Sequence, residues 1–395
     1  MIAEQEIIIK TERSPSLLAT GFALFSMFFG AGNLIFPLLI GKATGGNWGY
    51  AILGLGLTAV IVPFLGLAGM VFFQADCRRF FGRLGAIPGV MLLLLLQLIL
   101  GPFGVIPRLI TLMHATFKPY CLNLSLPAFS IGAALVIFLC SFRRQNLIGL
   151  LGIVLTPILL LSLGFLFFSG FFHKLPIASI SVSPSSSFFQ GLLGGYNTMD
   201  LIAAFLFATV VLPHFQKKVD LNPSLDQKKA LSRKMLFSSL IAAALLLFTY
   251  IGLTFISVYH GNFSSGNSED LLSLIAFRLL GPIGGFIASI AIVTACLTTA
   301  ITLSLIFADY LQKDLCKEKI HPMMALGVTL FITTCFANLG FSSIAAFLSP
   351  ILQICYPGLI VLTVLNIIYY FTGFKAIKVP VFLTFLLSSL FYFWS

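Results

Sequence analysis

The stretch GFALFSMFFGAGNLIFP, residues 21–37, has the composition of a membrane-spanning helix that is interrupted near its middle. It lies within residues 17–40, which carry no charged side chain, and roughly 20 apolar residues suffice for a helix to cross a bilayer. Gly30, Gly32 and Asn33 weaken the helix, and Pro37 lacks the N–H that would bond to the preceding turn. Lipid cannot pair the backbone groups that a break releases. The break therefore predicts a cavity in which these groups can bind a cation or a carboxylate.

A second stretch, GLLGGYNTMD at residues 191–200, repeats the order of glycines followed by Asn, and Pro213 lies at its far end. Glycines within spans can also be simple packing contacts between helices. Two interruptions in corresponding spans favour a binding site over packing alone.

The composition places most of the chain in lipid. Of its 395 residues, 59% are hydrophobic and only 9% are charged, whereas soluble domains have about 25% charged residues. The net charge of +11 is not gathered into a basic stripe with interleaved aromatics, so a nucleic-acid partner is not expected. The seven cysteines form no C-x-x-C pair, and no disulfide framework is expected.

Charge-free runs and loop signals predict an all-α integral membrane protein with eleven spans. The predicted spans are residues 17–40, 48–73, 86–117, 127–142, 147–172, 188–213, 235–259, 272–308, 322–338, 343–371 and 379–395. They divide into a tail (1–16), a five-span repeat (17–172), a second, inverted repeat (188–371) and an additional span (379–395). Two inverted sets of five spans, each led by a broken helix, are typical of secondary transporters.

The distribution of cations predicts the orientation. With the N-terminus in the cytoplasm, cytoplasmic segments hold eighteen of the twenty-three Lys and Arg residues: Lys10, Arg13, Arg78, Arg79, Arg83, Arg143, Arg144, Lys217, Lys218, Lys228, Lys229, Arg233, Lys234, Lys313, Lys317, Lys319, Lys375 and Lys378. Cytoplasmic loops carry such an excess. Eleven spans leave the C-terminus outside, in the periplasm.

The predicted eighth span carries a candidate cation site. Ala295, Thr298 and Thr299 are spaced i, i+3 and i+4, so they share one face of a helix. Two hydroxyls and a carbonyl suit Na⁺, which binds oxygen ligands. Alternatively, the threonines bond only to their own preceding turn.

Arg108 and Asp200 are charged residues within predicted spans, where a charge costs roughly 3 kcal/mol or more. Arg108 follows Pro107 and could serve a gate, pair with Asp200 or extend toward the membrane surface. Asp200 could ligate a cation, carry a proton or cap the second half of its span. Both are therefore candidates for a gate or a coupling group.

Six stretches resemble the branched-chain amino acid carrier family, the bacterial leucine/isoleucine/valine cation symporters of the amino acid–polyamine–organocation superfamily. They are FFGAGNLIFP (28–37), GPFGVIPR (101–108), GYNTMDLIAA (195–204), ACLTTA (295–300), FANLG (336–340) and YPG (356–358). They follow the family order over nearly the whole chain. The family usually has twelve spans, whereas this sequence predicts eleven.

The resemblance implies a leucine-transporter-like fold of two inverted five-helix repeats. It also implies import of leucine, isoleucine and valine across the bacterial inner membrane, driven by Na⁺ or H⁺ and without another cofactor. By analogy with the superfamily, the substrate contacts the two broken spans at Gly30, Ala31, Gly32, Asn33, Gly194, Gly195, Tyr196, Asn197 and Thr198. Its carboxylate would bind near Gly32 and Asn33. Na⁺ would lie between Gly30, Ala31, Ala295, Thr298 and Thr299.

Other functions remain to be distinguished. An ion channel could use Arg108 and Asp200 along a pore, but the sequence contains no evident ring of filter residues. A transporter of another small amino acid is also compatible with the pattern. An intramembrane enzyme is not expected, because there is no H-E-x-x-H and no pair of histidines at ligand spacing.

Overall fold

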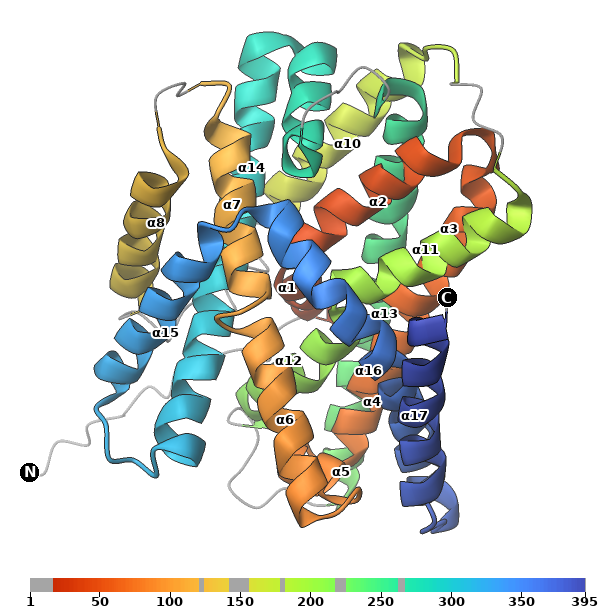
Figure 1. Ribbon diagram of the computed structural model, residues 1–395, viewed down its shortest axis with the longest axis vertical. Coiled ribbons are helices and arrows are strands. Elements are labelled where there is room, and N and C mark those ends of the chain that lie inside the picture. The colour runs from red at the N-terminus through yellow and green to blue at the C-terminus, as the bar shows by residue number, and fades with distance from the viewer. Residues whose placement is uncertain are drawn as a thin grey trace, which may run out of the picture.

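The computed structural model describes residues 17–120, 124–141, 156–177, 182–216, 225–261 and 267–394, and it describes the side chains of these residues except 213–216 and 225–232. Nearly all of this part of the chain is helical, and it contains no strand (Figure 1). The predicted tail, residues 1–16, and the start of the predicted fifth span, residues 147–155, lie outside the described residues.

The helices follow the predicted order of spans. Their bounds are α1 Leu17–Phe28, α2 Ala31–Thr44, α3 Trp48–Gly56, α4 Val62–Phe72, α5 Cys77–Gly82, α6 Ala86–Leu100, α7 Val105–Phe117, α8 Leu126–Cys140, α10 Thr156–Phe172, α11 Pro184–Thr198, α12 Asp200–Gln216, α13 Leu225–His260, α14 Leu271–Tyr310, α15 Pro322–Ala337, α16 Phe341–Thr372 and α17 Lys378–Trp394. Short π-helical segments at Leu57–Ile61 and Leu311–Leu315 join α3 to α4 and extend α14.

Most predicted boundaries agree with these helices to within a few residues, but the helix of the seventh span begins at Leu225 rather than at residue 235. The sixth span begins earlier than predicted, at Pro184 rather than at residue 188, because Ser183 caps the helix by accepting a hydrogen bond from the Ser186 N–H at 3.2 Å. Six described helical stretches are long and apolar enough to cross a membrane, and five further apolar helices have 10–17 residues.

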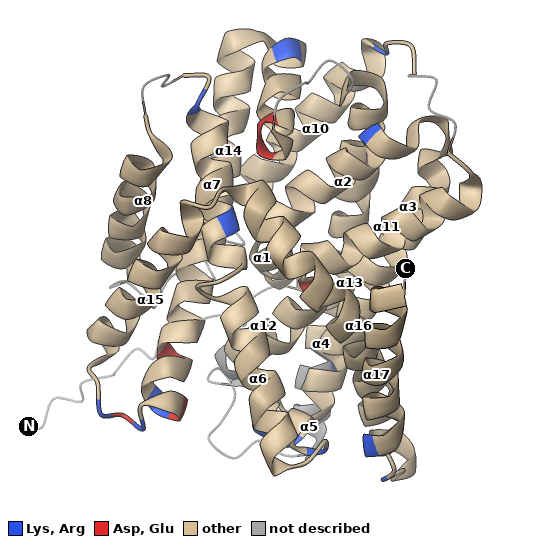
Figure 2. Ribbon diagram, in the orientation of Figure 1, with Lys and Arg blue, Asp and Glu red and all other residues tan. Residues whose placement is uncertain are grey.

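The outer surface of the bundle is apolar and its charges lie at the ends of the helices. Ile87, Ile283 and Phe391 are 73%, 79% and 77% exposed, a pattern that suits contact with lipid rather than water. Figure 2 shows the Lys, Arg, Asp and Glu residues gathered mainly at the two ends of the bundle. Ion pairs at these ends join Arg78 to Asp314 and Lys118 to Asp270.

The first span is broken where the sequence predicts it. The helix stops at Phe28 and resumes at Ala31, with Gly30 extended (φ −114°, ψ −167°). The Asn33 side chain stabilises the restart, because its Oδ1 accepts the Gly30 N–H at 3.1 Å. That N–H is then unable to bond to the carbonyl of Ser26, its partner in an unbroken helix.

The second break differs from the prediction. Helix α11 continues through Gly194 and Gly195 and ends at Thr198, and Met199, in a left-handed conformation (φ 64°), separates it from α12. The two glycines are packing residues: Gly194 faces Ile40 of α2, and Gly195 faces Thr58. Close helix packing, rather than helix breaking, explains these glycines.

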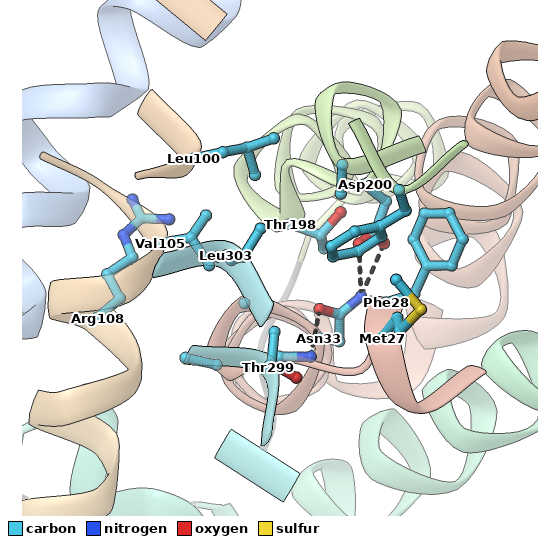
Figure 3. Close-up of a pocket in the computed structure, with 15 residues that line it drawn as sticks. Met27, Phe28, Asn33, Leu100, Val105, Arg108, Thr198, Asp200, Thr299 and Leu303 are labelled. Atoms are coloured by element: carbon cyan, nitrogen blue, oxygen red, sulfur yellow. Dashed lines mark hydrogen bonds between the residues drawn. The ribbon is translucent and has the colours of Figure 1, made fainter. Parts of the chain in front are cut away.

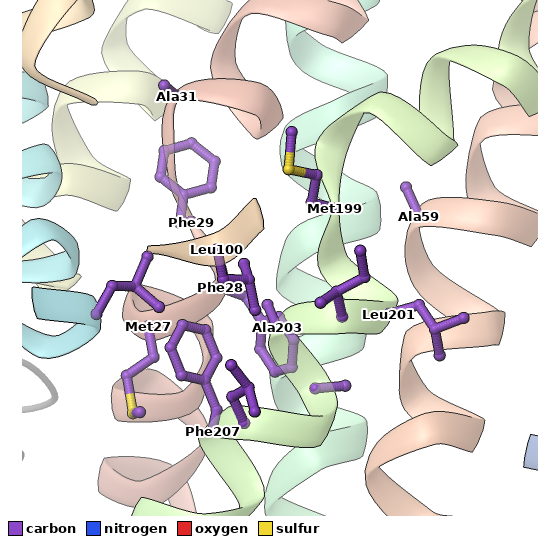
Figure 4. Close-up of a cluster of buried hydrophobic side chains, with 14 of the residues drawn as sticks. Met27, Phe28, Phe29, Ala31, Ala59, Leu100, Met199, Leu201, Ala203 and Phe207 are labelled. Carbon is purple, nitrogen blue, oxygen red and sulfur yellow. The ribbon is translucent and has the colours of Figure 1, made fainter. Parts of the chain in front are cut away.

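Two further interruptions occur in other described helices. Residues 101–104 separate α6 from α7, and α14 bends at Gly281 (φ 69°) before Pro282. The broken spans lie in the middle of the bundle, and α17 lies at its edge beside α16 (Figure 1). A large group of buried apolar side chains surrounds both central breaks (Figure 4).

The contact between α3 and α11 predicts the effect of a small substitution. A Cβ added at Gly191 would lie 2.7 Å from the carbonyl carbon and 3.0 Å from the Cα of Ala51, both backbone atoms that cannot rotate away. Gly191→Ala is therefore expected to lower the free energy of unfolding by about 1–3 kcal/mol. The measurement is the thermal midpoint of the purified protein in detergent.

Gly46→Ala is the matched control, because a Cβ at Gly46 meets no atom of the described residues within 4 Å. Equal thermal midpoints for the two variants would contradict this account of the α3–α11 contact.

Candidate functional site

A cavity lies where the two central breaks meet. Gly32, in the first turn of α2, abuts the end of α11 so closely that a Cβ there would lie 3.0 Å from the Cα of Thr198. The cavity lies between α1, α2, α6, α7, α11, α12 and α14 (Figure 3). It is lined by Met27, Phe28, Gly30, Ala31, Gly32, Asn33, Leu100, Val105, Arg108, Thr198, Asp200, Ala203, Phe207, Thr299 and Leu303.

Asp200 anchors a buried hydrogen-bond cluster on one side of this cavity. The Asn33 amide nitrogen donates to the two carboxylate oxygens at 2.9 and 2.7 Å. The Tyr250 hydroxyl donates to Oδ2 at 2.7 Å and lies 2.5 Å from the Asn33 nitrogen. The three side chains come from α2, α12 and α13, so the cluster joins three spans. Asp200 is also the first residue of α12, where the helix dipole stabilises a negative charge.

Arg108 lies on the other side of the cavity. It is 2% exposed, so it does not extend toward the membrane surface. Its Nη1 donates to the Asn197 carbonyl at 3.1 Å, and its guanidinium carbon lies 5.6 and 5.4 Å from the ring centroids of Phe36 and Phe341. Within the described part of the chain, no ion pair joins Arg108 to Asp200.

The candidate cation residues share one face of α14, as the sequence predicts. The Thr298 and Thr299 hydroxyls both donate to the Ala295 carbonyl, at 2.8 and 3.1 Å. These bonds to the preceding turn of the same helix are the alternative to cation binding. The Thr299 hydroxyl, however, also lies 3.3 Å from the Ser26 carbonyl of α1. Ser26 is the carbonyl that the break in the first span leaves without its helical partner. Sequence reasoning missed it, although it lies four residues before Gly30, where a break releases a carbonyl.

The structure separates the predicted substrate residues into two groups. Gly30, Ala31, Gly32, Asn33 and Thr198 line the cavity. The others are not among its lining residues. Gly194 and Gly195 pack against neighbouring helices, the Tyr196 ring contacts the Tyr356 ring with 4.7 Å between centroids, and the Asn197 carbonyl accepts a hydrogen bond from Arg108. They lie within α11 because this helix continues to Thr198.

Sequence reasoning also missed the apolar lining and Tyr250. Met27, Phe28, Phe207 and Leu303 line the cavity, but they are ordinary residues in a chain with 42 phenylalanines. Nothing in the local sequence distinguishes Tyr250, which is 217 residues from Asn33.

Comparison with known proteins identifies the family. The family described as "Branched-chain amino acid transport protein" matches residues 13–393. The chain belongs to this family. It is 30% identical over 361 residues to "Branched-chain amino acid permease BraB" of Bacillus subtilis (strain 168), covering 88% of this chain and 79% of that protein. It is 31% identical over 393 residues to a "Putative branched-chain amino acid carrier protein" of Staphylococcus aureus (strain USA300), covering 93% of this chain and 86% of that protein.

Solved transporters share the fold of this family member. The "Inward facing conformation of Mhp1" matches with a TM-score of 0.60 at 14% identity, over 90% of this chain and 76% of that chain. MhsT "in complex with L-phenylalanine" matches with a TM-score of 0.56 at 16% identity, over 95% of this chain and 98% of that chain. The predicted leucine-transporter-like fold is confirmed. The chain is a multi-pass membrane protein of a transporter family.

The cluster around Asp200 predicts the effect of removing one hydroxyl. Tyr250 is fully buried, and Tyr250→Phe leaves a buried carboxylate without one of its donors. We expect the free energy of unfolding to fall by about 1–3 kcal/mol, measured as a lower thermal midpoint in detergent.

Tyr259→Phe is the control on the same helix, because the Tyr259 hydroxyl makes no hydrogen bond to another described residue. If Tyr250→Phe and Tyr259→Phe have the same thermal midpoint, the Tyr250 hydroxyl does not stabilise the Asp200 carboxylate.

Proposed function

We propose that this protein is a secondary active symporter that imports leucine, isoleucine and valine across the bacterial inner membrane, driven by Na⁺ through alternating access. The main support is the cavity at the two broken helices, which combines apolar side chains with backbone groups at helix ends. The relatives named as a branched-chain amino acid permease and carrier support the substrate class.

The cavity offers complementary groups for each part of an amino acid. The free N–H groups near Gly32 and Asn33, at the positive end of α2, suit the carboxylate. At the end of α11 the carbonyls of Gly195, Tyr196 and Asn197 already accept hydrogen bonds, so the Thr198 carbonyl is left for the ammonium group. Met27, Phe28, Phe207 and Leu303 suit a branched aliphatic side chain.

A Na⁺ ion between α1 and α14 would couple its gradient to the bundle. The carbonyls of Ser26 and Ala295 and the hydroxyls of Thr298 and Thr299 lie together, and they are hard oxygen ligands. Gly30 and Ala31, also proposed as ligands, line the same cavity as Thr299. An ion that binds this arrangement more tightly in one conformation than in another shifts the population toward it.

The orientation completes the proposal. The N-terminus faces the cytoplasm, because that orientation places most cations there, and the C-terminus faces the periplasm. Residues 17–172 and 188–371 act as the two inverted repeats, with 379–395 outside them. A second candidate for coupling is H⁺, carried by Asp200, since a buried carboxylate in a membrane is an established type of proton carrier.

Uptake into proteoliposomes tests the function. Radiolabelled leucine should accumulate under an inward Na⁺ gradient, and isoleucine and valine should compete for uptake. Equal uptake of lysine or glutamate would contradict the proposed substrate, and electrical conductance far above carrier turnover would favour a channel. Uptake that follows a pH gradient without Na⁺ would assign coupling to Asp200 in place of the threonine site.

Thr299→Ala tests the cation site. The substitution removes one neutral oxygen ligand with little change in volume, so it should raise the Na⁺ concentration for half-maximal uptake by about 10-fold, with the deficit recovered at high Na⁺. Initial uptake rates measured across a Na⁺ series give this midpoint.

Thr294→Ala on the same helix is the matched control, because its hydroxyl bonds to the Ile290 carbonyl of its own helix at 2.7 Å. If both variants keep the parent's Na⁺ concentration for half-maximal uptake, Thr299 does not ligate Na⁺ and contributes only to helix packing.

A further inference from the structure

Two nitrogens of the buried Arg108 guanidinium have no hydrogen-bond partner among the described residues. These are Nε and Nη2, and both are shielded from solvent. The third nitrogen, Nη1, donates to the Asn197 carbonyl. A guanidinium keeps its charge inside proteins, so an unpaired buried one is costly and calls for an anion.

The geometry of the guanidinium defines which anion suits it. Nε and Nη2 lie along one edge of the planar group, and such an edge donates two parallel hydrogen bonds to the two oxygens of a carboxylate. The guanidinium carbon lies over the rings of Phe36 and Phe341, 5.6 and 5.4 Å from their centroids, and Nη1 is taken by the Asn197 carbonyl. The free edge is therefore the part of the group that is left to bind a ligand.

Arg108 belongs to the wall of the cavity proposed for the substrate. The Asn197 carbonyl that holds Nη1 also lies 3.3 Å from the Cβ position of Gly32, so the guanidinium is held close to the positive end of α2. Figure 3 shows Arg108 and Asp200 on opposite sides of the cavity, with Val105, Leu303 and Thr198 between them. The carboxylate of Asp200 is already paired with Asn33 and Tyr250 and does not reach Arg108.

We propose that Arg108 binds the α-carboxylate of the transported amino acid through its Nε and Nη2 edge. This inference rests on the proposed function and adds to it a residue that selects amino acids over the corresponding amines. Phe36 of α2 and Phe341 of α16 keep the guanidinium in place. Their rings lie 6.2 Å apart between centroids, so carboxylate binding links three separate spans at one point.

The experiment compares ligands that differ only at the carboxylate. Purified protein is bound to radiolabelled leucine, which is displaced by unlabelled leucine, by leucinamide or by 3-methylbutylamine. In the parent protein leucinamide should bind about 10- to 150-fold more weakly than leucine, because it lacks the charge that strengthens the two hydrogen bonds. In Arg108→Gln leucine should weaken to the level of leucinamide, while 3-methylbutylamine should bind as it does to the parent. Arg108→Lys keeps the charge without the planar edge, so its affinity for leucine should lie between that of the parent and that of Arg108→Gln.

Arg83→Gln is the matched control. Arg83 also lies over a ring, 3.7 Å from the Tyr369 centroid, and it donates to the Asn366 side chain at 2.8 Å, but it is not among the residues that line the cavity. It should keep the parent ratio of leucine to leucinamide affinity. The same ratio in Arg108→Gln would overturn the proposal.

Two outcomes do not depend on the folding of any variant. If leucinamide and leucine displace radiolabelled leucine from the parent protein with equal affinity, the proposed role of Arg108 is wrong, but leucine remains the substrate. A parent protein that binds no leucine would contradict the proposed function and this inference together.

Discussion

The side chain of Asn33 connects the break in the first span to the rest of the bundle. Its Oδ1 accepts the Gly30 N–H, and its nitrogen donates to the Asp200 carboxylate. In lipid every released backbone group needs a partner inside the protein, so a helix break is stable only where side chains supply one. Asn33 supplies that partner for α2 and anchors α12 to it. The Ser26 carbonyl, released by the same break, then lies beside Thr299.

Both halves of the first span pack against α13, but the hydrogen bonds beside the break link each half to other helices as well. Helix α1 meets α14 through the Ser26 carbonyl and the Thr299 hydroxyl. Helix α2 meets α12 and α13 through Asp200 and Tyr250, and Phe36 of α2 lies near the Arg108 guanidinium of α7. The polar contacts on the two sides of the break therefore differ, although both halves of the span share α13 as a packing partner.

The two buried charged residues, Asp200 and Arg108, contact different groups and not each other. Asp200 accepts hydrogen bonds from an amide and a phenol. Arg108 has one carbonyl and two aromatic rings as neighbours, and among the described residues its Nε and Nη2 have no hydrogen-bond partner. If Arg108 and Asp200 formed a salt bridge with each other, their charges would already be paired, and neither would be available to bind a zwitterionic ligand. Their separation leaves Arg108 as a positively charged group in a wall that is otherwise largely apolar.

The sequence by itself determined the membrane class, the order of the spans and the break at Gly30, because charge-free runs and adjacent helix-weakening residues are local properties. It also determined the shared face of Thr298 and Thr299, which follows from helix periodicity. The tertiary structure alone decided that the second break falls at Met199, because Gly194 and Gly195 serve packing against other helices. It also decided the partners of Asp200 and Arg108. These contacts join residues 50 to 217 positions apart, and the packing of distant helices, which leaves no local pattern in the sequence, brings them together.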